Sequence, residues 1–92
     1  MEFKKEDQIR AYILRKLARF RKWGESHTAF DHIQSGMPSH LRDKAKDEGK
    51  KLIRDGLILS KSTHYGLEIS LNPLRAKEIK DIIKRFYGDS SD

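Results

Sequence analysis

The apolar residues of this chain change their spacing at Gly56. Before Gly56, and again after Pro73, they recur every three or four residues, which is the spacing of a helix with one buried face. Between these points the apolar run Leu57-Ile58-Leu59 is followed by Leu67, Ile69 and Leu71 on every second residue, as in strands. Helices followed by two strands and a further helix predict an α+β fold that is mostly helical. Because the chain has only 92 residues, we expect one domain, 1–92, around one core.

The first predicted helix covers about residues 5–23 and ends at Gly24. Its apolar residues give one stripe, formed by Ile9, Tyr12, Ile13, Leu17 and Phe20. Its outer face carries six cations, which are Arg10, Arg15, Lys16, Arg19, Arg21 and Lys22. Residues 1–23 contain eight Lys and Arg residues against three carboxylates. Most of the net positive charge is therefore expected on this helix.

A second, short helix is predicted over about residues 28–35. Ser26 or Thr28 can cap it, and Thr28 with Asp31 three residues later resembles a capping box. Phe30 and Ile33 supply its buried side. The helix is expected to end there because residues 35–38, Ser-Gly-Met-Pro, combine a glycine that permits a left-handed turn with a proline that cannot continue a helix.

The third helix is predicted over about residues 39–55, starting at Pro38 or Ser39 and stopping at Gly56. Its narrow apolar face is formed by Leu41, Ala45, Gly49 and Leu52. A glycine in the middle of a helix costs roughly 1 kcal/mol relative to alanine. Gly49 therefore indicates either the close approach of a neighbouring backbone or a locally weak turn.

A hairpin is predicted over about residues 57–71, with strands at 57–59 and 67–71 and the loop KSTHYG between them. In the second strand Leu67, Ile69 and Leu71 alternate with polar residues. Asn72 followed by Pro73 then predicts a fourth helix over about residues 73–87. Its apolar residues are Ile79, Ile82, Ile83 and Phe86. Residues 88–92 are expected to fray.

The order of helix, short helix, tight turn, longer helix, hairpin and helix resembles the winged helix-turn-helix family of DNA-binding domains. The phrase KKLIRDGLIL, at the end of the third helix and the start of the hairpin, resembles one common in that family. The resemblance covers roughly residues 5–87 and identifies no subfamily. It implies that the second and third helices form a helix-turn-helix, with the third helix offered to a DNA groove and the hairpin acting as a wing.

The face of the third helix opposite its apolar residues carries mixed charge. Arg42, Lys46 and Lys50 suit phosphates or guanine edges, and Ser39 and His40 start the helix, where a phosphate contact is favoured. Asp43, Asp47, Lys51 and Arg54 share or flank this face. The two aspartates would repel phosphates. The alternative is a solvated face with pairs such as Asp47 and Lys51.

The hairpin loop supplies the other candidate DNA contacts, Lys61, Ser62, Thr63, His64 and Tyr65. These short donors, one cation and one aromatic ring suit phosphate and sugar contacts in a minor groove. Alternatively, Tyr65 folds back as a cap on the hairpin's core. The basic face of the first helix is a second candidate phosphate surface, or else an ordinary solvated face.

Several kinds of site are not expected. The chain has no cysteine, which excludes disulfides and thiolate metal sites. The four histidines, at positions 27, 32, 40 and 64, lie on at least three elements, so no metal site is predicted. No catalytic triad, paired-carboxylate motif or glycine-rich phosphate loop is present, so we expect neither an enzyme nor a cofactor. Without a signal-like or membrane-spanning apolar segment, a cytoplasmic or nucleoid-associated protein is expected.

The net charge of +6 and isoelectric point near 9.7 favour a polyanionic partner. The leading hypothesis is a small DNA-binding protein, a transcriptional regulator that contacts duplex DNA mainly through phosphates. The alternatives are a protein-interaction or assembly module of the same fold and an RNA-binding module. The aromatic residues Phe20, Trp23, Phe86 and Tyr87, on the terminal helices, could form a homodimer interface or complete the core.

Overall fold

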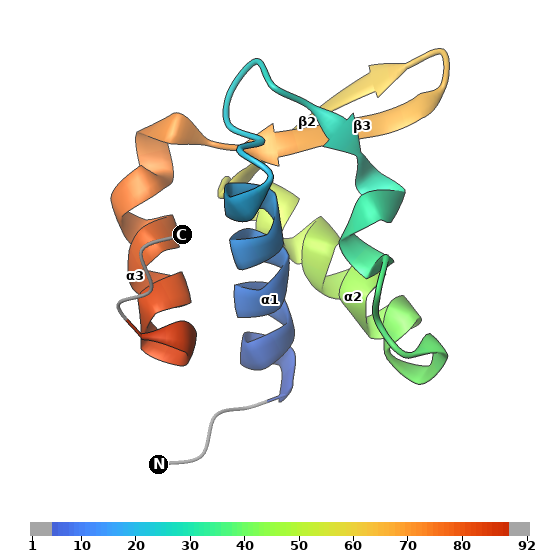
Figure 1. The fold of residues 1–92 in the computed structure, drawn as a ribbon. Coiled ribbons are helices and arrows are strands. Elements are labelled where there is room, and N and C mark those ends of the chain that lie inside the picture. The colour runs from blue at the N-terminus through green and yellow to red at the C-terminus, as the bar shows by residue number, and fades with distance from the viewer. Residues whose placement is uncertain (1–4, 89–92) are drawn as a thin grey trace.

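The computed structural model describes residues 5–88 and shows an α+β fold (Figure 1). Its long helices are α1 (Lys5–Arg19), α2 (Ser39–Arg54) and α3 (Ala76–Tyr87). Its strands are β1 (Thr28–Ala29), β2 (Ile58–Thr63) and β3 (Gly66–Leu71), and two short 3-10 helices are η1 (Phe30–Gln34) and η2 (Pro73–Arg75). The strands form one antiparallel sheet in the order β1-β3-β2.

Helix α1 lies between α2 and α3 and contacts both (Figure 1). The predicted apolar stripe is buried at Ile9, Ile13 and Leu17, as expected for a core-facing helix face. Ala11 is also fully buried, although it lies off that stripe. Its burial follows from the central place of α1, which has neighbours on more than one side.

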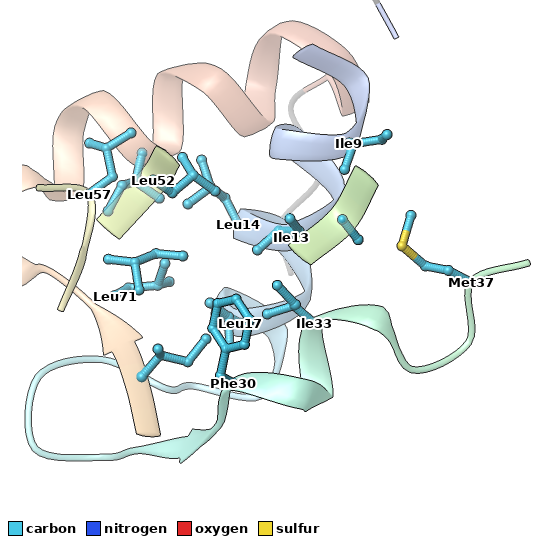
Figure 2. Packing of buried hydrophobic residues seen from close by; sticks show 14 residues of the cluster. Ile9, Ile13, Leu14, Leu17, Phe30, Ile33, Met37, Leu52, Leu57 and Leu71 are labelled. Carbon is cyan, nitrogen blue, oxygen red and sulfur yellow. The ribbon is translucent and has the colours of Figure 1, made fainter. Parts of the chain in front are cut away.

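The core gathers apolar side chains from all three helices, from η1 and from the base of the hairpin (Figure 2). Leu14 and Leu17 of α1 belong to the same cluster as Leu52 of α2 and Leu71 of β3. The buried members are Ile9, Ile13, Leu14, Leu17, Phe30, Ile33, Met37, Ala45, Leu52, Leu57, Ile58, Ile69, Leu71 and Ile79. These side chains form one core cluster within residues 5–88.

Helix α1 ends at Arg19, four residues before its predicted end. The chain leaves the helix through Arg21, whose φ is +58°, and then runs beside the end of β3. There the Leu71 amide donates to the Lys22 carbonyl at 2.7 Å, and the Gly24 amide donates to the Leu71 carbonyl at 3.0 Å. Trp23 thus forms a parallel bridge with Leu71. A backbone pairing with a strand distant in sequence shortens the helix.

The predicted helix over residues 28–35 is wrong in its first turn. Thr28 and Ala29 form β1, paired with Ile69 and Glu68 of β3, and only the 3-10 helix η1 follows. The predicted capping box is absent, because no side chain caps η1 and the Thr28 hydroxyl is instead 2.7 Å from Nδ1 of His32. Ser26, the other predicted cap, precedes β1 and is exposed.

Helix α2 agrees closely with its prediction, starting after Pro38 and ending at Arg54. Gly56 has a φ of +85°, the left-handed conformation expected of a glycine at a helix end. Of the two alternatives for Gly49, the structure shows the close approach of a neighbour. The neighbours are side chains, however, and not the backbone that was predicted. A Cβ at position 49 would lie 2.5 Å from Cδ1 of Ile33 and 3.1 Å from Cε1 of Phe30.

The hairpin covers the predicted residues, but its strands are longer than predicted. Strand pairing continues to Thr63 and Gly66, so His64 and Tyr65 alone form the turn, and Lys61 to Thr63 belong to β2. Alternation is missing from the outer part of β2 because Ser60, Lys61 and Ser62 are all exposed and meet no core.

The middle strand β3 is buried more completely than alternation predicts. Ser70 is fully buried between Ile69 and Leu71, and its hydroxyl donates to the Gly24 carbonyl at 2.7 Å. This bond allows a polar side chain to occupy the interior.

Asn72 caps the helical turn that follows it, since its side-chain oxygen accepts from the Leu74 amide at 3.0 Å. The residues after it form η2, however, and α3 begins only at Ala76. Of the predicted frayed tail, Gly88 follows α3 directly, and residues 89–92 lie outside the described range.

Candidate nucleic-acid interface

The exposed face of α2 carries the predicted candidates of the third helix. Ser39 and His40 are exposed in its first turn, and Arg42 is exposed with its Nε donating to the Met37 carbonyl at 3.3 Å. Lys50 is exposed and Lys46 is half-buried. Within residues 5–88, no ion pair or side-chain hydrogen bond involves Lys46 or Lys50. Both ammonium groups are therefore open to an external anion.

Two carboxylates share this face, as the sequence predicts. Asp43 and Asp47 are exposed, and in the described part of the chain neither forms an ion pair. The suggested pair of Asp47 with Lys51 is wrong, because Lys51 lies 3.2 Å from Glu48 instead. Arg54 pairs with its neighbour Asp55, also at 3.2 Å. The exposed face of α2 thus carries both positive and negative charge.

Glu48 is a buried carboxylate that the sequence analysis missed. It is 3% exposed, and Nε of Arg10 donates to its Oε1 at 2.7 Å. The prediction that Arg10 belongs to the outer basic face of α1 is therefore wrong. Its side chain points at α2. The signal was available: Glu48 follows Leu41 and Ala45 at helical spacing, which places it on the buried face of α2.

The hairpin projects from the body of the molecule on the side of α2, away from α3 (Figure 1). Four of its five candidate contact residues are exposed, namely Lys61, Ser62, His64 and Tyr65. Tyr65 is 98% exposed, so the alternative that it folds back as a cap on the hairpin's core is wrong.

Thr63, the fifth candidate, is half-buried and stabilises the turn. Its Oγ1 donates to the Gly66 carbonyl at 2.8 Å and accepts from the Tyr65 amide at 3.1 Å. Its hydroxyl is thereby used within the hairpin. The two bonds fix the backbone that presents Tyr65 to solvent.

A third surface of interest lies along α1. Tyr12, Arg15, Lys16, Arg19 and Phe20 line a hollow of about 420 Å³. The guanidinium of Arg15 stacks over the ring of Tyr87, 4.4 Å from its centre. Nζ of Lys16 donates to the Ser35 carbonyl at 2.5 Å, and burial lowers the pKa of this lysine. Basic and aromatic side chains are thus combined on one concave surface.

The terminal aromatic residues do not form one cluster. Trp23 packs against the core, whereas Phe20 is 64% exposed and lies beside the α1 hollow. Phe86 is half-buried, and Tyr87 contacts Arg15. Trp23 therefore belongs to the edge of the core, whereas Phe20 and Tyr87 lie at the surface along α1.

No group of three or more His, Cys, Asp or Glu residues within residues 5–88 has the arrangement of a metal site. In the same range, no helix combines the length and apolarity needed to cross a bilayer.

Comparison with known proteins identifies no relative of this chain: no family model, no curated protein and no solved structure matches it.

Proposed function

We propose that this chain is a winged helix domain that binds duplex nucleic acid, DNA foremost, with α2 and the β2–β3 hairpin. The observation that carries the proposal is the hairpin tip, where a fully exposed tyrosine stands on a turn fixed by Thr63. A tyrosine at the end of a projecting turn, with an apolar ring and a polar hydroxyl, is well placed to contact another molecule.

The arrangement of α2 supports the same surface. Its apolar face packs on α1 and η1, so its opposite face remains available to a groove. The turn at 35–38 separates η1 from α2, in the order expected of a helix-turn-helix. Together with the hairpin and α3, this element order supports the proposal of a winged helix domain, the family which the sequence resembles.

The charges of this surface favour phosphate contacts over base reading. Lys46 and Lys50 are unpaired cations on α2, and Lys61 is an exposed cation on the hairpin. The amides at the start of α2, around Ser39, add donors suited to a phosphate oxygen. Asp43 and Asp47 oppose close approach of the backbone at the middle of the helix. We therefore propose a protein that binds many sequences with modest affinity, a DNA-associated regulator whose register is set by backbone contacts.

Salt titration tests the proposal. Binding to a duplex of about 20 base pairs, measured by fluorescence anisotropy, is expected to weaken about 50-fold between roughly 50 and 200 mM salt, as about three phosphate contacts require. Duplex RNA and single strands of the same sequence serve as competitors, and duplex DNA is expected to compete best. Absence of binding at the lowest salt, or an affinity that does not depend on salt, would contradict the proposal.

A second candidate function, a protein-interaction module, rests on exposed apolar side chains away from this surface. Leu74, in η2, is 92% exposed, and Phe20 at the end of α1 is 64% exposed. Light scattering tests whether they join two copies of the chain. A monomer at all concentrations, together with salt-dependent binding to DNA, favours the first function over the second.

A further inference from the structure

We infer that a hollow between the end of α1, β1 and η1 binds a small oxyanion of the size of phosphate. The hollow has a volume of about 210 Å³. Four polar and two apolar side chains line it, which are Lys16, Lys22, Thr28, His32, Leu17 and Phe20. No residue of α2, β2 or β3 lines it. The site is therefore separate from the α2–hairpin surface, and the inference does not rest on the proposed DNA binding.

The backbone holds the connection between α1 and β1 in place beside this hollow. The Lys22 amide donates to the Leu17 carbonyl at 2.9 Å, and the Lys22 carbonyl accepts from the Leu71 amide of β3 at 2.7 Å. Six residues later, Thr28 pairs with Ile69 of the same strand. Both ends of the connection are thus fixed on β3. Lys22 and Thr28 thereby line the same hollow from positions that are set by the fold.

Two lysines give the hollow its positive charge. Within residues 5–88, no ion pair and no side-chain hydrogen bond involves Lys22. The partners of the Lys16 ammonium are uncharged: it donates to the Ser35 carbonyl and lies 5.9 Å from the centre of the Tyr12 ring. No Asp or Glu among the described residues lines the hollow. An anion placed there would therefore meet two ammonium groups that have no carboxylate partner in the described part of the chain.

The Lys16 ammonium has lost part of its hydration. Burial lowers the pKa of this lysine, because removal from water disfavours the charged form. One of its three N–H groups is used by the Ser35 carbonyl, which leaves two for a ligand. An adjacent anion would offset the lost hydration and would use these donors.

Thr28 and His32 add a donor, whichever way the hydrogen bond between them runs. The Thr28 hydroxyl lies 2.7 Å from Nδ1 of His32. If the hydroxyl donates to a neutral ring, that ring carries its proton on Nε2; if Nδ1 donates, the hydroxyl proton is left over. One N–H or O–H group is thus not used within the pair in either tautomer. An ion with several acceptor oxygens can bind this donor and both ammonium groups together.

The size and the apolar part of the lining favour a small ion. Sites for drug-sized molecules have volumes of about 300–1,000 Å³, and this hollow is smaller. Leu17 and Phe20 supply apolar surface beside the charged groups. Charge contacts next to apolar side chains are stronger, because water competes with them less.

Amide chemical-shift mapping of the full chain tests the inference, with inorganic phosphate and sulfate as probes. Each probe replaces sodium chloride at constant ionic strength, so that only a preference over chloride gives a response. Both are expected to shift the amides of Lys22, Thr28 and His32 along one saturable curve. Their affinity is expected to exceed that of chloride at least about tenfold, since chloride has no set of acceptor oxygens.

Variants separate a built site from general attraction of anions. Lys22→Gln is expected to weaken phosphate binding about fivefold, because it removes one of the two charged contacts. Arg21→Gln is the matched control: it removes the same charge from the preceding residue, which is exposed and does not line the hollow. It is expected to change affinity by less than about twofold.

Thr28→Val tests the uncharged donor. Valine keeps the branched shape that suits β1 but lacks the hydroxyl, and it is expected to weaken phosphate binding about threefold. The amide spectrum shows whether this variant keeps the fold. If it does not, Lys22→Gln with its control decides the question alone.

Three outcomes would overturn the inference. The first is the absence of a saturable response to phosphate and sulfate. The second is an equal effect of Lys22→Gln and Arg21→Gln, which would make net charge responsible. The third is a shift of these amides by duplex DNA and not by either small probe, which would make the hollow part of a nucleic-acid interface. A duplex that fails to bind α2 and the hairpin would change none of these results, so the two proposals fail separately.

Discussion

At the scale of single residues, Glu48 links the first two long helices by charge. Its carboxylate is almost fully buried and is paired with Arg10 of α1 and Lys51 of α2. All buried side-chain polar atoms within the described range have a hydrogen-bond partner. Removal of one member of such a group leaves the others without compensation.

Glu48→Ala is expected to lower the free energy of unfolding by about 2 kcal/mol, less than for a fully buried pair because Arg10 retains some contact with water. Urea denaturation measures the change. Glu78→Ala is the matched control, since Glu78 also pairs with an arginine, Arg75, but is exposed. Its expected cost is below about 1 kcal/mol. Equal losses in the two variants would contradict the role given to Glu48.

At the scale of elements, the packing of α2 on η1 depends on Gly49. Its missing side chain leaves room for Ile33 and Phe30, both of which are buried. Alanine would favour the helix by about 1 kcal/mol but would be forced against Cδ1 of Ile33. The two effects oppose each other, and the clash is expected to be larger.

Gly49→Ala is therefore expected to lower the free energy of unfolding by about 1 kcal/mol net. In a chain that also carries Ile33→Val, which removes the clashing Cδ1, the same substitution is expected to be neutral or stabilising. A double-mutant cycle by urea denaturation measures this coupling. If Gly49→Ala stabilises the chain equally in both backgrounds, the close approach does not constrain this position.

Tyr65, at the hairpin tip, is expected to contribute to duplex affinity but not to stability. Tyr65→Ala is expected to leave the free energy of unfolding within about 0.5 kcal/mol, because the side chain is almost fully exposed, yet to weaken duplex affinity about fivefold. Leu74→Ala, at an equally exposed position outside the proposed interface, is the control and should not change affinity. Anisotropy titrations measure both variants. Unchanged affinity in Tyr65→Ala would remove the hairpin tip from the interface.

The elements that the sequence predicts correctly are those with strong local signals. Helix α2 has a proline before it, a glycine after it and a regular apolar face, and its bounds agree with the structure within one residue. Thr28 and Ala29 carry local signals of a helix start, but they pair with a strand some forty residues later in the chain. Such pairing cannot be seen in local spacing. Likewise, the outer part of the hairpin contacts no core. Its residues therefore lack the alternation of apolar and polar side chains that would have indicated the length of the strands.

The candidate site, like the fold, could be predicted from the sequence only where local signals determine it. Exposure of the α2 cations and of the hairpin follows from helical spacing and turn residues, and the structure confirms the exposure of Lys50, Lys61 and His64. The α1 hollow and the pair of Arg10 with Glu48 arise from the way the helices meet. These features depend on tertiary contacts that the sequence pattern does not specify.

At the scale of the whole molecule, positive charge is distributed over two surfaces with different surroundings. On α2 and the hairpin it is mixed with Asp43, Asp47 and Glu68 and extends along a projecting element. On α1 it lines a hollow with no described carboxylate in its lining. The first arrangement suits an extended polyanion that contacts cations in a row.

The effect of paired charge removal on duplex affinity tests the central claim, that α2 and the hairpin form the nucleic-acid interface. Lys46→Gln with Lys50→Gln is expected to weaken binding about 20-fold and to reduce the salt slope by about 2. Lys80→Gln with Arg85→Gln removes the same charge from exposed positions of α3 and is expected to cost about twofold. Equal weakening by the two pairs, with the same loss of slope, would show that net charge alone attracts the duplex and would contradict the claim.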